Sequence, residues 1–337
     1  MLNYKSILIT GGTGSFGKMF TQRIIQNYPD VKRLVIFSRD ELKQYEMAQT
    51  YSGRKYPQVR YFIGDIRDRQ RLKRACEGID VIIHAAALKQ VPTAEYNPDE
   101  CIKTNIIGAQ NVVDAALDTK VKIVVALSTD KAAAPINLYG ATKLVSDKLF
   151  VAANNIKGSR DLRFSVVRYG NVMGSRGSVI PFFRALAQNG NKLPITHKDM
   201  TRFNISLEEG VEMVLWAIEN AIGKEIFVPK IPSYKIETLA RAVSPNADFE
   251  YVGIRAGEKL HEEMITETDS HNTIEFDKYF AILPSDIDKD KYLTYYNARK
   301  VPLGFSYSSG RNSDWETVES LQKKIRKFVD PKFEPGL

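Results

Sequence analysis

The feature that most constrains the fold of this chain is a glycine-rich turn between a short apolar run and an amphipathic segment. The apolar run is residues 6–10 (Ser-Ile-Leu-Ile-Thr), and Gly11, Gly14 and Gly17 follow it with the spacing G-x-x-G-x-x-G. Apolar residues then recur at helical intervals from Phe16 onward. A strand, a glycine turn and a helix in this order favour a βαβ unit whose backbone comes close to a phosphate group. The N–H groups at the start of the helix favour the same anion, so we expect a dinucleotide at this turn.

Apolar runs continue to alternate with helical patterns up to about residue 170. This alternation predicts an α/β fold with a doubly wound parallel sheet of the Rossmann type. Beyond that point the chain becomes glycine-rich and polar, which is typical of a loop that meets a ligand. We expect residues 1–170 to bind the dinucleotide, a segment of about 204–230 to return to that domain, and residues 171–337 to form mainly a smaller substrate domain. The expected strands lie at 6–10, 33–37, 59–64, 80–84, 122–127 and 165–169.

In a sheet of this kind the ligand lies beyond the carboxyl ends of the strands. The second strand ends in Ser38, Arg39 and Asp40. NAD enzymes usually place a carboxylate here for the ribose 2′-hydroxyl, whereas Arg39 can pair with the 2′-phosphate of NADP. We favour NADP, and Asp40 leaves NAD open. The expected cofactor contacts are Gly11, Thr13, Gly14, Ser15, Phe16, Gly17, Ser38, Arg39, Asp40, Lys43, Asp65, Ile66, Ala85, Ala86, Lys89, Thr104, Tyr139 and Lys143.

The stretch after the fifth apolar run carries groups suited to proton transfer. Tyr139 and Lys143 are one helical turn apart on one face of the expected helix. A phenol beside an ammonium group is expected to give up its proton near neutral pH, because the cation stabilises the phenolate. The expected catalytic residues are Thr129, Asp130, Lys131, Tyr139 and Lys143.

Phosphate-binding side chains recur in the second half of the chain. Arg202 stands beside Phe203, a pair suited to a phosphate or a base. Arg255 and Glu258 are suited to a diphosphate and a ribose hydroxyl. The expected substrate contacts are Lys89, Asn171, Val179, Arg202, Arg255 and Glu258, and we expect no metal site.

Composition narrows the class of ligand. The net charge of +8 favours anionic ligands, but Lys and Arg are scattered and their densest cluster, at 323–327, fits a solvated helix face. We therefore expect phosphate-bearing small molecules and no nucleic acid. The N-terminus resembles no signal peptide, no run approaches the ~20 apolar residues that span a bilayer, and Cys76 and Cys101 are the only cysteines. We expect a cytoplasmic protein without a membrane partner.

The assembled motifs resemble the extended short-chain dehydrogenase/reductase family over nearly the whole chain. They are the glycine turn, Asp65-Ile66, the alanine run and Tyr-x-x-x-Lys. Within that family, 128–143 is similar to the UDP-N-acetylglucosamine 4,6-dehydratases that invert carbon 5, with Thr-Asp-Lys where other 4,6-dehydratases carry Thr-Asp-Glu. The runs 168–178 and 255–262 are similar to the same group. The resemblance implies a lyase of the pseudaminic-acid pathway for flagellin or surface glycans. It also implies NADP bound and regenerated in each cycle, and a homo-oligomer such as a hexamer.

The chemistry that this resemblance implies suits the residues present. Tyr139, helped by Lys143, takes a proton from the sugar 4-hydroxyl while hydride leaves carbon 4. Lys131, with a pKa lowered by burial and by Lys143, removes the proton of carbon 5, and protonated Asp130 assists departure of the 6-hydroxyl. Hydride then returns to carbon 6. The product is a UDP-2-acetamido-2,6-dideoxy-4-keto-L-arabino-hexose.

Other functions stay open at this point. A nucleotide-sugar 4-epimerase shares the tyrosine, the lysine and the glycine turn, but it has no need of the Asp130–Lys131 pair. A dehydratase that retains carbon 5 is a second alternative. A dinucleotide-sensing regulator needs none of the proton-transfer groups. A lipid or steroid reductase would carry a long apolar pocket in place of Arg202 and Arg255.

Overall fold

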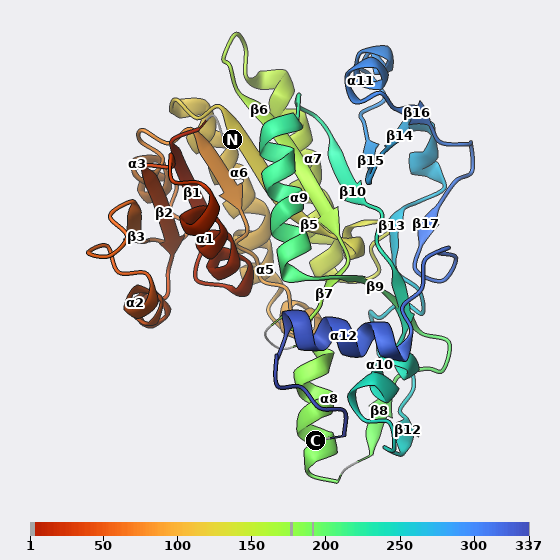
Figure 1. The fold of residues 1–337 in the computed structure, drawn as a ribbon. Coiled ribbons are helices and arrows are strands. Elements are labelled where there is room, and N and C mark those ends of the chain that lie inside the picture. Colours follow the sequence, from red (N-terminus) through yellow and green to blue (C-terminus); the bar gives the residue numbers. More distant parts are fainter. Residues whose placement is uncertain (1–3, 176–177, 191, 337) are drawn as a thin grey trace.

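The centre of the molecule is a ten-stranded sheet (Figure 1). The computed structural model describes residues 4–175, 178–190 and 192–336. The parallel strands are β1 (Ser6–Thr10), β2 (Arg33–Ser38), β3 (Val59–Ile63), β4 (Val81–His84), β5 (Ile123–Thr129), β6 (Arg163–Tyr169) and β10 (Ile226–Pro229). They lie in the spatial order β10-β6-β5-β4-β1-β2-β3, so chain order reverses between β4 and β1. Open α/β sheets bind their ligands beside such a reversal.

The doubly wound parallel sheet expected from the sequence is confirmed. β1 and β4 are buried along their whole length, as befits strands covered by helices on both faces. Their Ile- and Val-rich sequences show no alternation of polar and apolar residues for the same reason.

Three antiparallel strands extend the sheet beyond β10, and the sequence analysis did not predict this extension. They are β15 (Tyr279–Ile282), β14 (Thr273–Phe276) and β16 (Arg299–Lys300), in that spatial order. The short helix α11 (Lys289–Tyr296) lies between β15 and β16 in the chain.

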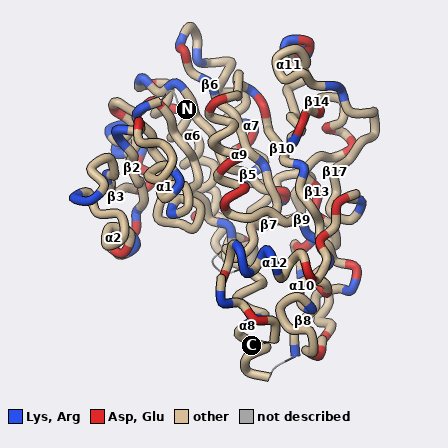
Figure 2. Tube along the Cα trace, in the orientation of Figure 1, with Lys and Arg blue, Asp and Glu red and all other residues tan. Residues whose placement is uncertain are grey.

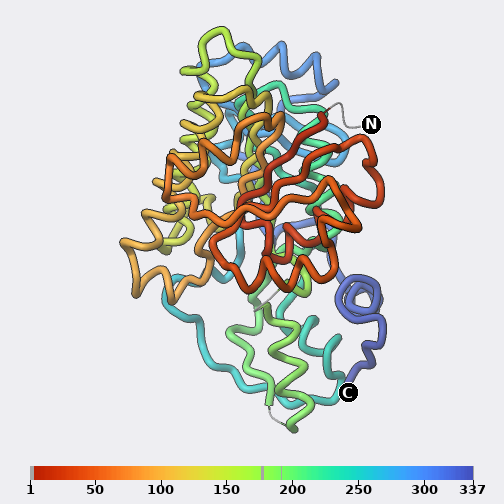
Figure 3. The backbone as a smooth tube through the Cα atoms, turned by 90° about the vertical axis from the view of Figure 1, so that its left-hand side faces the viewer, coloured from red at the N-terminus to blue at the C-terminus, as the bar shows by residue number. Residues whose placement is uncertain are grey.

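Helices cover both faces of the sheet. Figure 1 shows α1 and α9 in front of it and α6 and α7 behind it, and Figure 3 shows the layers from the side. The helix bounds are α1 (Ser15–Asn27), α2 (Glu41–Thr50), α3 (Arg69–Ala75), α4 (Val91–Tyr96), α5 (Pro98–Ile102), α6 (Gly108–Asp118), α7 (Leu138–Ile156) and α9 (Leu207–Asn220), with a π-helical segment at Lys103–Ile107.

The segment that contains α9 and β10 joins the parallel sheet. β10 pairs with β6, and α9 packs against α1, where Arg23 forms an ion pair with Glu212. α9 begins with a capping box in which Ser206 and Glu209 satisfy each other's backbone N–H groups, as its sequence predicts. The capped helix thus places β10 beside β6.

A second, smaller core lies below the carboxyl edge of the sheet in the view of Figure 1. Its buried residues include Phe183, Leu193, Leu239, Leu321 and Phe333. Its elements are α8 (Val179–Gln188), β8 (Leu193–Ile195), α10 (Ile236–Val243), β12 (Phe249–Tyr251) and α12 (Val318–Phe328). Between the two cores lie the small sheets of β7 (Asn171–Val172), β9 (Thr201–Ile205) and β11 (Ser233–Lys235), and of β13 (Glu263–Ile265) and β17 (Tyr307–Ser308).

Basic and acidic residues are interspersed along the chain in both parts of the molecule (Figure 2). Within the described residues, no helix combines the length and the apolar character needed to cross a membrane. The same residues contain no group of three His, Cys, Asp or Glu side chains arranged to hold a metal ion.

Candidate active site

The glycine turn packs directly against the alanine run that follows β4. Gly11 has a φ of +66°, and a Cβ atom built on it would lie 2.9 Å from Ala86 Cα. A Cβ atom on Gly17 would lie 2.2 Å from the carbonyl oxygen of Gly12. A side chain at either position would therefore collide with neighbouring backbone, so the close packing of the turn requires glycine there. Gly14 caps α1 without a side chain, so the N–H groups of the first turn are left for an anion such as a pyrophosphate.

Thr10 at the end of β1 fixes the alanine run. Its hydroxyl accepts hydrogen bonds from the backbone N–H groups of Ala85 and Ala86 at 3.2 and 3.3 Å. The same hydroxyl lies 3.0 Å from Nδ1 of His84. Burial, with a smaller contribution from the positive charge of Lys143, lowers the pKa of His84 to about 3. His84 is therefore a neutral structural residue at the back of the site.

At the tip of β2 the carboxylate of Asp40 is already engaged. It caps α2 by accepting a hydrogen bond from the Lys43 backbone at 3.0 Å, and its other oxygen lies 2.5 Å from Lys43 Nζ. Arg39 is exposed, and its Nη1 lies 3.8 Å from Oδ2 of Asp65 at the tip of β3. Ser38 is buried and accepts a hydrogen bond from Gln44. The exposed guanidinium of Arg39 is therefore the group most accessible to a ligand at this tip.

Asp65 and Thr104 occupy two further predicted positions. Arg67 pairs with Asp65 at 2.7 Å, and although burial alone would raise the pKa of Asp65, its hydrogen bonds with Arg67 lower it. Thr104 lies in the π-helical segment, and its buried hydroxyl has no hydrogen-bond partner among the described residues. Ile66 packs on Gly108, where a Cβ atom would lie 2.5 Å from the Ile66 side chain. Single turns of π-helix are frequent at functional sites, and this one leaves a polar group for a ligand.

Asn105, in the same π-helical segment, organises the loop after the alanine run. Its amide exchanges hydrogen bonds with the backbone of Leu88, at 2.8 Å to the N–H and 2.9 Å to the carbonyl oxygen. It also donates to Thr142 Oγ1 on α7 at 3.0 Å. Asn105 thus fixes the loop that carries Lys89 relative to the helix that carries Tyr139. Sequence reasoning did not assign it a role, because only the fold brings these segments together.

The catalytic stretch begins where β5 ends. Asp130 opens a short 3₁₀ turn, Asp130–Ala132, and α7 begins after Asn137, whose side chain accepts a hydrogen bond from Gly140 N at 2.8 Å. A Cβ atom on Gly140 would lie 2.2 Å from the carbonyl oxygen of Lys131. The glycine that follows Tyr139 therefore lets the helix pack against the turn, which brings Tyr139 close to Lys131.

The structure corrects the expected state of the Tyr139–Lys143 pair. Burial raises the pKa of Tyr139 to about 12, and the positive charge of Lys131 and hydrogen bonding with Thr129 offset only part of this effect. Lys143 donates a hydrogen bond to the carbonyl oxygen of Leu127 at 2.7 Å, and burial lowers its pKa. The expectation that Lys143 makes Tyr139 a phenolate near neutral pH is wrong for the protein without ligands, because the desolvation of the phenol dominates.

The expectation of a lowered pKa for Lys131 is also wrong. Burial acts in the expected direction, but the negative charges of Asp130 and Glu262 outweigh it and raise the pKa of Lys131. Lys131 Nζ lies 3.1 Å from Asp130 Oδ1 and 3.2 Å from Glu262 Oε1. Thr129 donates a hydrogen bond to the same Asp130 oxygen at 2.9 Å. In this geometry Lys131 is an ammonium group held between two carboxylates.

Glu262 is the residue of the site that sequence reasoning missed. Its side chain is 3% exposed and meets Lys131 on one side and Arg202 on the other, with Arg202 Nε 3.8 Å from Glu262 Oε1. The preceding His261 hydrogen-bonds Thr201 at 2.8 Å and takes no part in this cluster. In the sequence, Glu262 ends the run 255–262 that resembles the inverting dehydratases, but no role was assigned to it.

The other predicted substrate residues surround this cluster with different degrees of accessibility. Arg202 is nearly buried, and its Nη1 donates to the carbonyl oxygens of Thr201, Lys259 and Leu260 at 2.7, 3.0 and 3.3 Å. Arg255 is exposed and lies 3.7 Å from Glu258. Burial and the nearby charge of Lys131 lower the pKa of Lys89. Val179 begins α8, while Arg176 and Gly177 of the preceding loop lie outside the described residues.

The segment 255–262 lies over the catalytic turn. Asn137 donates a hydrogen bond to Gly257 O at 2.8 Å, and Lys259 Nζ donates to Ala133 O at 2.7 Å. Several buried oxygens of the catalytic turn, of segment 255–262 and of the chain after β6 have no partner among the described residues. They are Oγ of Ser178, Oδ1 of Asn171, Oδ2 of Asp130, Oε2 of Glu258 and Oε2 of Glu262. Buried polar atoms are normally paired, so these oxygens indicate a place where a polar ligand binds.

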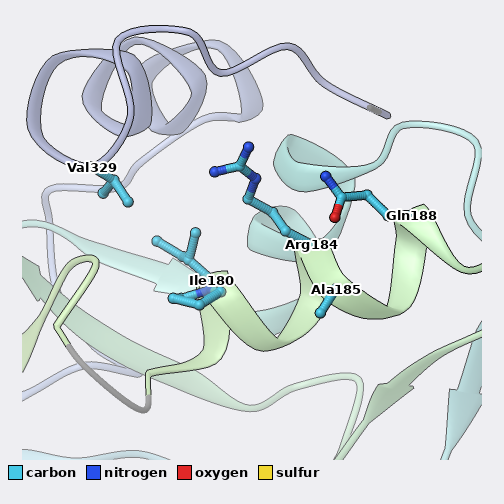
Figure 4. A pocket seen from close by; sticks show the side chains of 6 residues that line it. Ile180, Arg184, Ala185, Gln188 and Val329 are labelled. Atoms are coloured by element: carbon cyan, nitrogen blue, oxygen red, sulfur yellow. The ribbon is translucent and has the colours of Figure 1, made fainter.

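A surface cavity of ≈ 320 Å³ lies away from this site, between α8 and the end of α12 (Figure 4). Ile180, Pro181, Ala185, Gln188 and Val329 line it together with Arg184. Arg184 forms an ion pair with Asp330 at 2.9 Å, so the charged group of the cavity is already neutralised. The cavity shares no residue with the predicted site.

Comparison with solved structures places this geometry in a known fold. The chain superimposes on the X-ray structure of Pen from Bacillus thuringiensis with a TM-score of 0.87 and 36% identity, covering 97% of this chain and 98% of that one. It also resembles a dTDP-glucose 4,6-dehydratase from Streptomyces venezuelae, with a TM-score of 0.67 and 21% identity over 97% of this chain and 99% of that one. The second likeness concerns the fold alone. Both support an extended short-chain dehydrogenase/reductase fold.

Sequence comparisons place the chain more narrowly. It is 58% identical to a UDP-N-acetylglucosamine 4,6-dehydratase (inverting) of Campylobacter jejuni, covering 96% of this chain and 98% of the relative. It is 41% identical to a UDP-glucose 4-epimerase of Rickettsia canadensis, covering 94% and 95%. The resemblance to inverting dehydratases inferred from the motifs is thus confirmed. The model of the family described as "Polysaccharide biosynthesis protein" matches residues 7–284, and the chain belongs to this family.

Proposed function

We propose that the protein is an NADP-dependent UDP-N-acetylglucosamine 4,6-dehydratase that inverts carbon 5. The observation that carries the proposal is the ion pair of 3.1 Å between part-buried Lys131 and buried Asp130 at the carboxyl end of β5, close to Tyr139. A 4,6-dehydration needs a base to remove a proton and an acid to protonate the departing hydroxyl, in addition to the oxidation and reduction of the sugar. The name of the Campylobacter relative supports the same reaction.

The residues around the glycine turn fit a nicotinamide dinucleotide. The uncapped start of α1 suits the pyrophosphate, and glycine at positions 11 and 17 lets the turn pack against neighbouring backbone closely enough to present that start. We propose that Arg39 meets the 2′-phosphate of NADP, because Asp40 is engaged with Lys43 as the cap of α2. The partnerless hydroxyl of Thr104 is available to the cofactor as well. Bound at these residues, oxidised NADP would supply a positive charge, a hydride acceptor for carbon 4 and, once reduced, a hydride donor for carbon 6.

The protein side chains carry the protons. Tyr139 must first lose its own proton, which the positive charge of the bound cofactor would favour. The phenolate then takes the proton of the 4-hydroxyl as the 4-ketone forms, and the ketone acidifies the proton of carbon 5. Lys131 passes one proton to Asp130 along their 3.1 Å contact. The neutral amine of Lys131 then removes the proton of carbon 5, and the Asp130 carboxylic acid protonates the 6-hydroxyl so that it departs as water. Reprotonation of carbon 5 from the opposite face inverts it. Each acid or base role is typically worth ~10²–10⁴ in rate.

We propose that the nucleotide sugar lies between the carboxyl edge of the sheet and the second core. Arg255, Glu258 and Asn171 have polar groups that face this contact, and Val179 begins the helix beside it. Arg202 would influence the substrate through Glu262 and not by direct contact, because its guanidinium is already hydrogen-bonded to three carbonyl oxygens. The product would enter pseudaminic-acid synthesis for flagellin or surface glycans. We further propose a cytoplasmic homo-oligomer.

A UDP-glucose 4-epimerase is the second candidate, because relatives of that name cover almost the whole chain. Incubation of the purified protein with UDP-N-acetylglucosamine and, separately, with UDP-glucose separates the two activities. The dehydratase predicts loss of one water from the N-acetylated substrate, detected by mass spectrometry. An unchanged mass with appearance of the 4-epimer in proton NMR would establish the epimerase instead.

A further inference from the structure

Glu262 stands where the second part of the molecule meets the catalytic turn. It ends the segment 255–262 and directly precedes β13. Its side chain is 3% exposed, with Oε1 3.2 Å from Lys131 Nζ, and Oε2 has no partner among the described residues. A buried carboxylate without good pairing is costly, so its position beside a proton-transfer residue calls for a reason.

We propose that Glu262 is a positioning residue of the dehydratase site, which holds the amino group of Lys131 against Asp130 and maintains its basicity during elimination. The proposal rests on the function proposed above. It assigns to the second part of the molecule a direct influence on the acid–base pair that β5 and α7 carry.

The charges around Lys131 explain why such a residue is needed. Arg202 is a buried cation near Lys131, and Lys89 also lies close enough for the positive charge of Lys131 to affect it. Like charges in a buried site repel an ammonium group strongly. Glu262 lies between Lys131 and Arg202, at 3.2 and 3.8 Å, and compensates this repulsion. The groups that face Lys131 are Asp130, Glu262, Arg202, Lys89, Tyr139 and Tyr234.

The proton balance of the cluster is consistent with this role. With Asp130 and Glu262 ionised and Lys131 and Arg202 charged, the net charge of the four groups is zero. Transfer of one proton from Lys131 Nζ to the Asp130 carboxylate, along the 3.1 Å contact, gives a neutral amine and a neutral carboxylic acid. Glu262 and Arg202 then neutralise each other, so the net charge is still zero. The transfer produces the base and the acid that elimination needs without a proton from solvent.

The test compares Glu262→Gln, which removes the charge, with Glu262→Asp, which keeps it, and with Glu263→Gln as the matched control. Glu263 neighbours Glu262 in the chain and makes no ion pair among the described contacts. We expect Glu262→Gln to lower kcat for dehydration by about 10²-fold, the cost of a displaced catalytic group, with a smaller change in KM. The alkaline limb of its kcat–pH profile should move to lower pH. Without the negative charge of Glu262 the pKa of Lys131 falls, and the active form needs the proton that Lys131 and Asp130 share. Glu262→Asp should keep the wild-type limb, and Glu263→Gln should match the wild type throughout.

A second readout is independent of turnover. The protein is labelled with ¹³C at lysine Cε, and the Lys131 signal is assigned by its loss in Lys131→Ala and titrated without substrate. In Glu262→Gln this signal should titrate at lower pH than in the wild type. Melting temperatures verify that each variant is folded, and Glu262→Met, which also removes the charge, carries the test if Glu262→Gln is not folded.

The outcomes separate two failures. A wild-type protein that converts UDP-N-acetylglucosamine, with a Glu262→Gln variant of unchanged kcat and pH profile, would overturn the role of Glu262 alone. A lowered melting temperature with an unchanged Lys131 titration would show a purely structural ion pair and would also overturn it. A shifted Lys131 titration in a protein that forms no product would overturn the dehydratase function while leaving the pairing intact.

Discussion

At the scale of single residues, the proposed function depends most on Lys131. We expect Lys131→Ala to reduce dehydration by ~10²–10⁴-fold, because no other amine among the described residues is paired with Asp130. Binding of NADP and UDP-N-acetylglucosamine, measured by calorimetry, should stay close to that of the wild type. Lys148→Ala, which replaces an exposed lysine on α7, the helix that follows the catalytic turn, is the control and should be fully active. Greatly weakened binding in Lys131→Ala would make this residue a ligand anchor instead of a base.

Arg39 is predicted to decide between the two nicotinamide cofactors. Its guanidinium is exposed at the tip of β2, whereas Asp40 is engaged with Lys43. Since hydrogen bonds to charged groups are worth about 1.5–3 kcal/mol, Arg39→Ala should weaken NADP binding by roughly 10- to 100-fold and leave NAD binding nearly unchanged. Fluorescence titration of the reduced cofactors measures both affinities. Equal losses for the two cofactors would contradict the assignment.

The identities of the proton-transfer residues could be predicted from the sequence, but their charge states could not. Spacing places Tyr139 and Lys143 on one face of a helix and Asp130 and Lys131 at the end of a strand. Their pKa values depend on burial and on neighbours that arrive from elsewhere in the chain. Asp130 and Glu262 together raise the pKa of Lys131 against the expected direction, and Glu262 is more than 100 residues from Lys131 in the chain.

At the scale of elements, the contact between the catalytic turn and α7 requires a glycine. Because a Cβ atom on Gly140 would lie 2.2 Å from the Lys131 carbonyl oxygen, Gly140→Ala must push the turn and the helix apart. We expect a lower melting temperature and a loss of kcat of about 10²-fold, the typical cost of misplacing a catalytic group by about 1 Å. Gly53→Ala is the control, since its Cβ atom would approach nothing closer than 3.7 Å. A fully active Gly140→Ala variant would show that this contact does not position Lys131.

The elements themselves were predicted best where local pattern and packing agree. The strands of the parallel sheet are long apolar runs, and the glycine turn and the capping box have local sequence signals. The antiparallel strands β14, β15 and β16 are short, and their place in the sheet depends on the pairing of β15 with β10, of β14 with β15 and of β16 with β14. The π-helical segment also has no local signal. Its partnerless Thr104 hydroxyl becomes apparent only in the folded chain.

At the scale of the whole molecule, buried tyrosines predict a loss of stability at alkaline pH. Burial raises the pKa of Tyr139 and Tyr234 from 10.0 to about 12. The unfolded chain therefore loses these protons first, and stability that is complete below pH 10 should fall as the pH rises toward 12. Each group accounts for up to about 3 kcal/mol. Urea unfolding between pH 8 and 12 measures the loss, which Tyr234→Phe should reduce, whereas an equal loss in this variant would contradict the account.

The central claim for the whole molecule is that the two parts together perform an inverting elimination. The most direct test is incubation with UDP-N-acetylglucosamine in deuterated water, followed by mass spectrometry and proton NMR of the product. The account predicts loss of one water, one solvent deuteron at carbon 5, and couplings of the L-arabino configuration. A dehydrated product that retains the original configuration at carbon 5 would contradict inversion, and a sugar nucleotide that keeps all its oxygens would contradict the dehydratase itself.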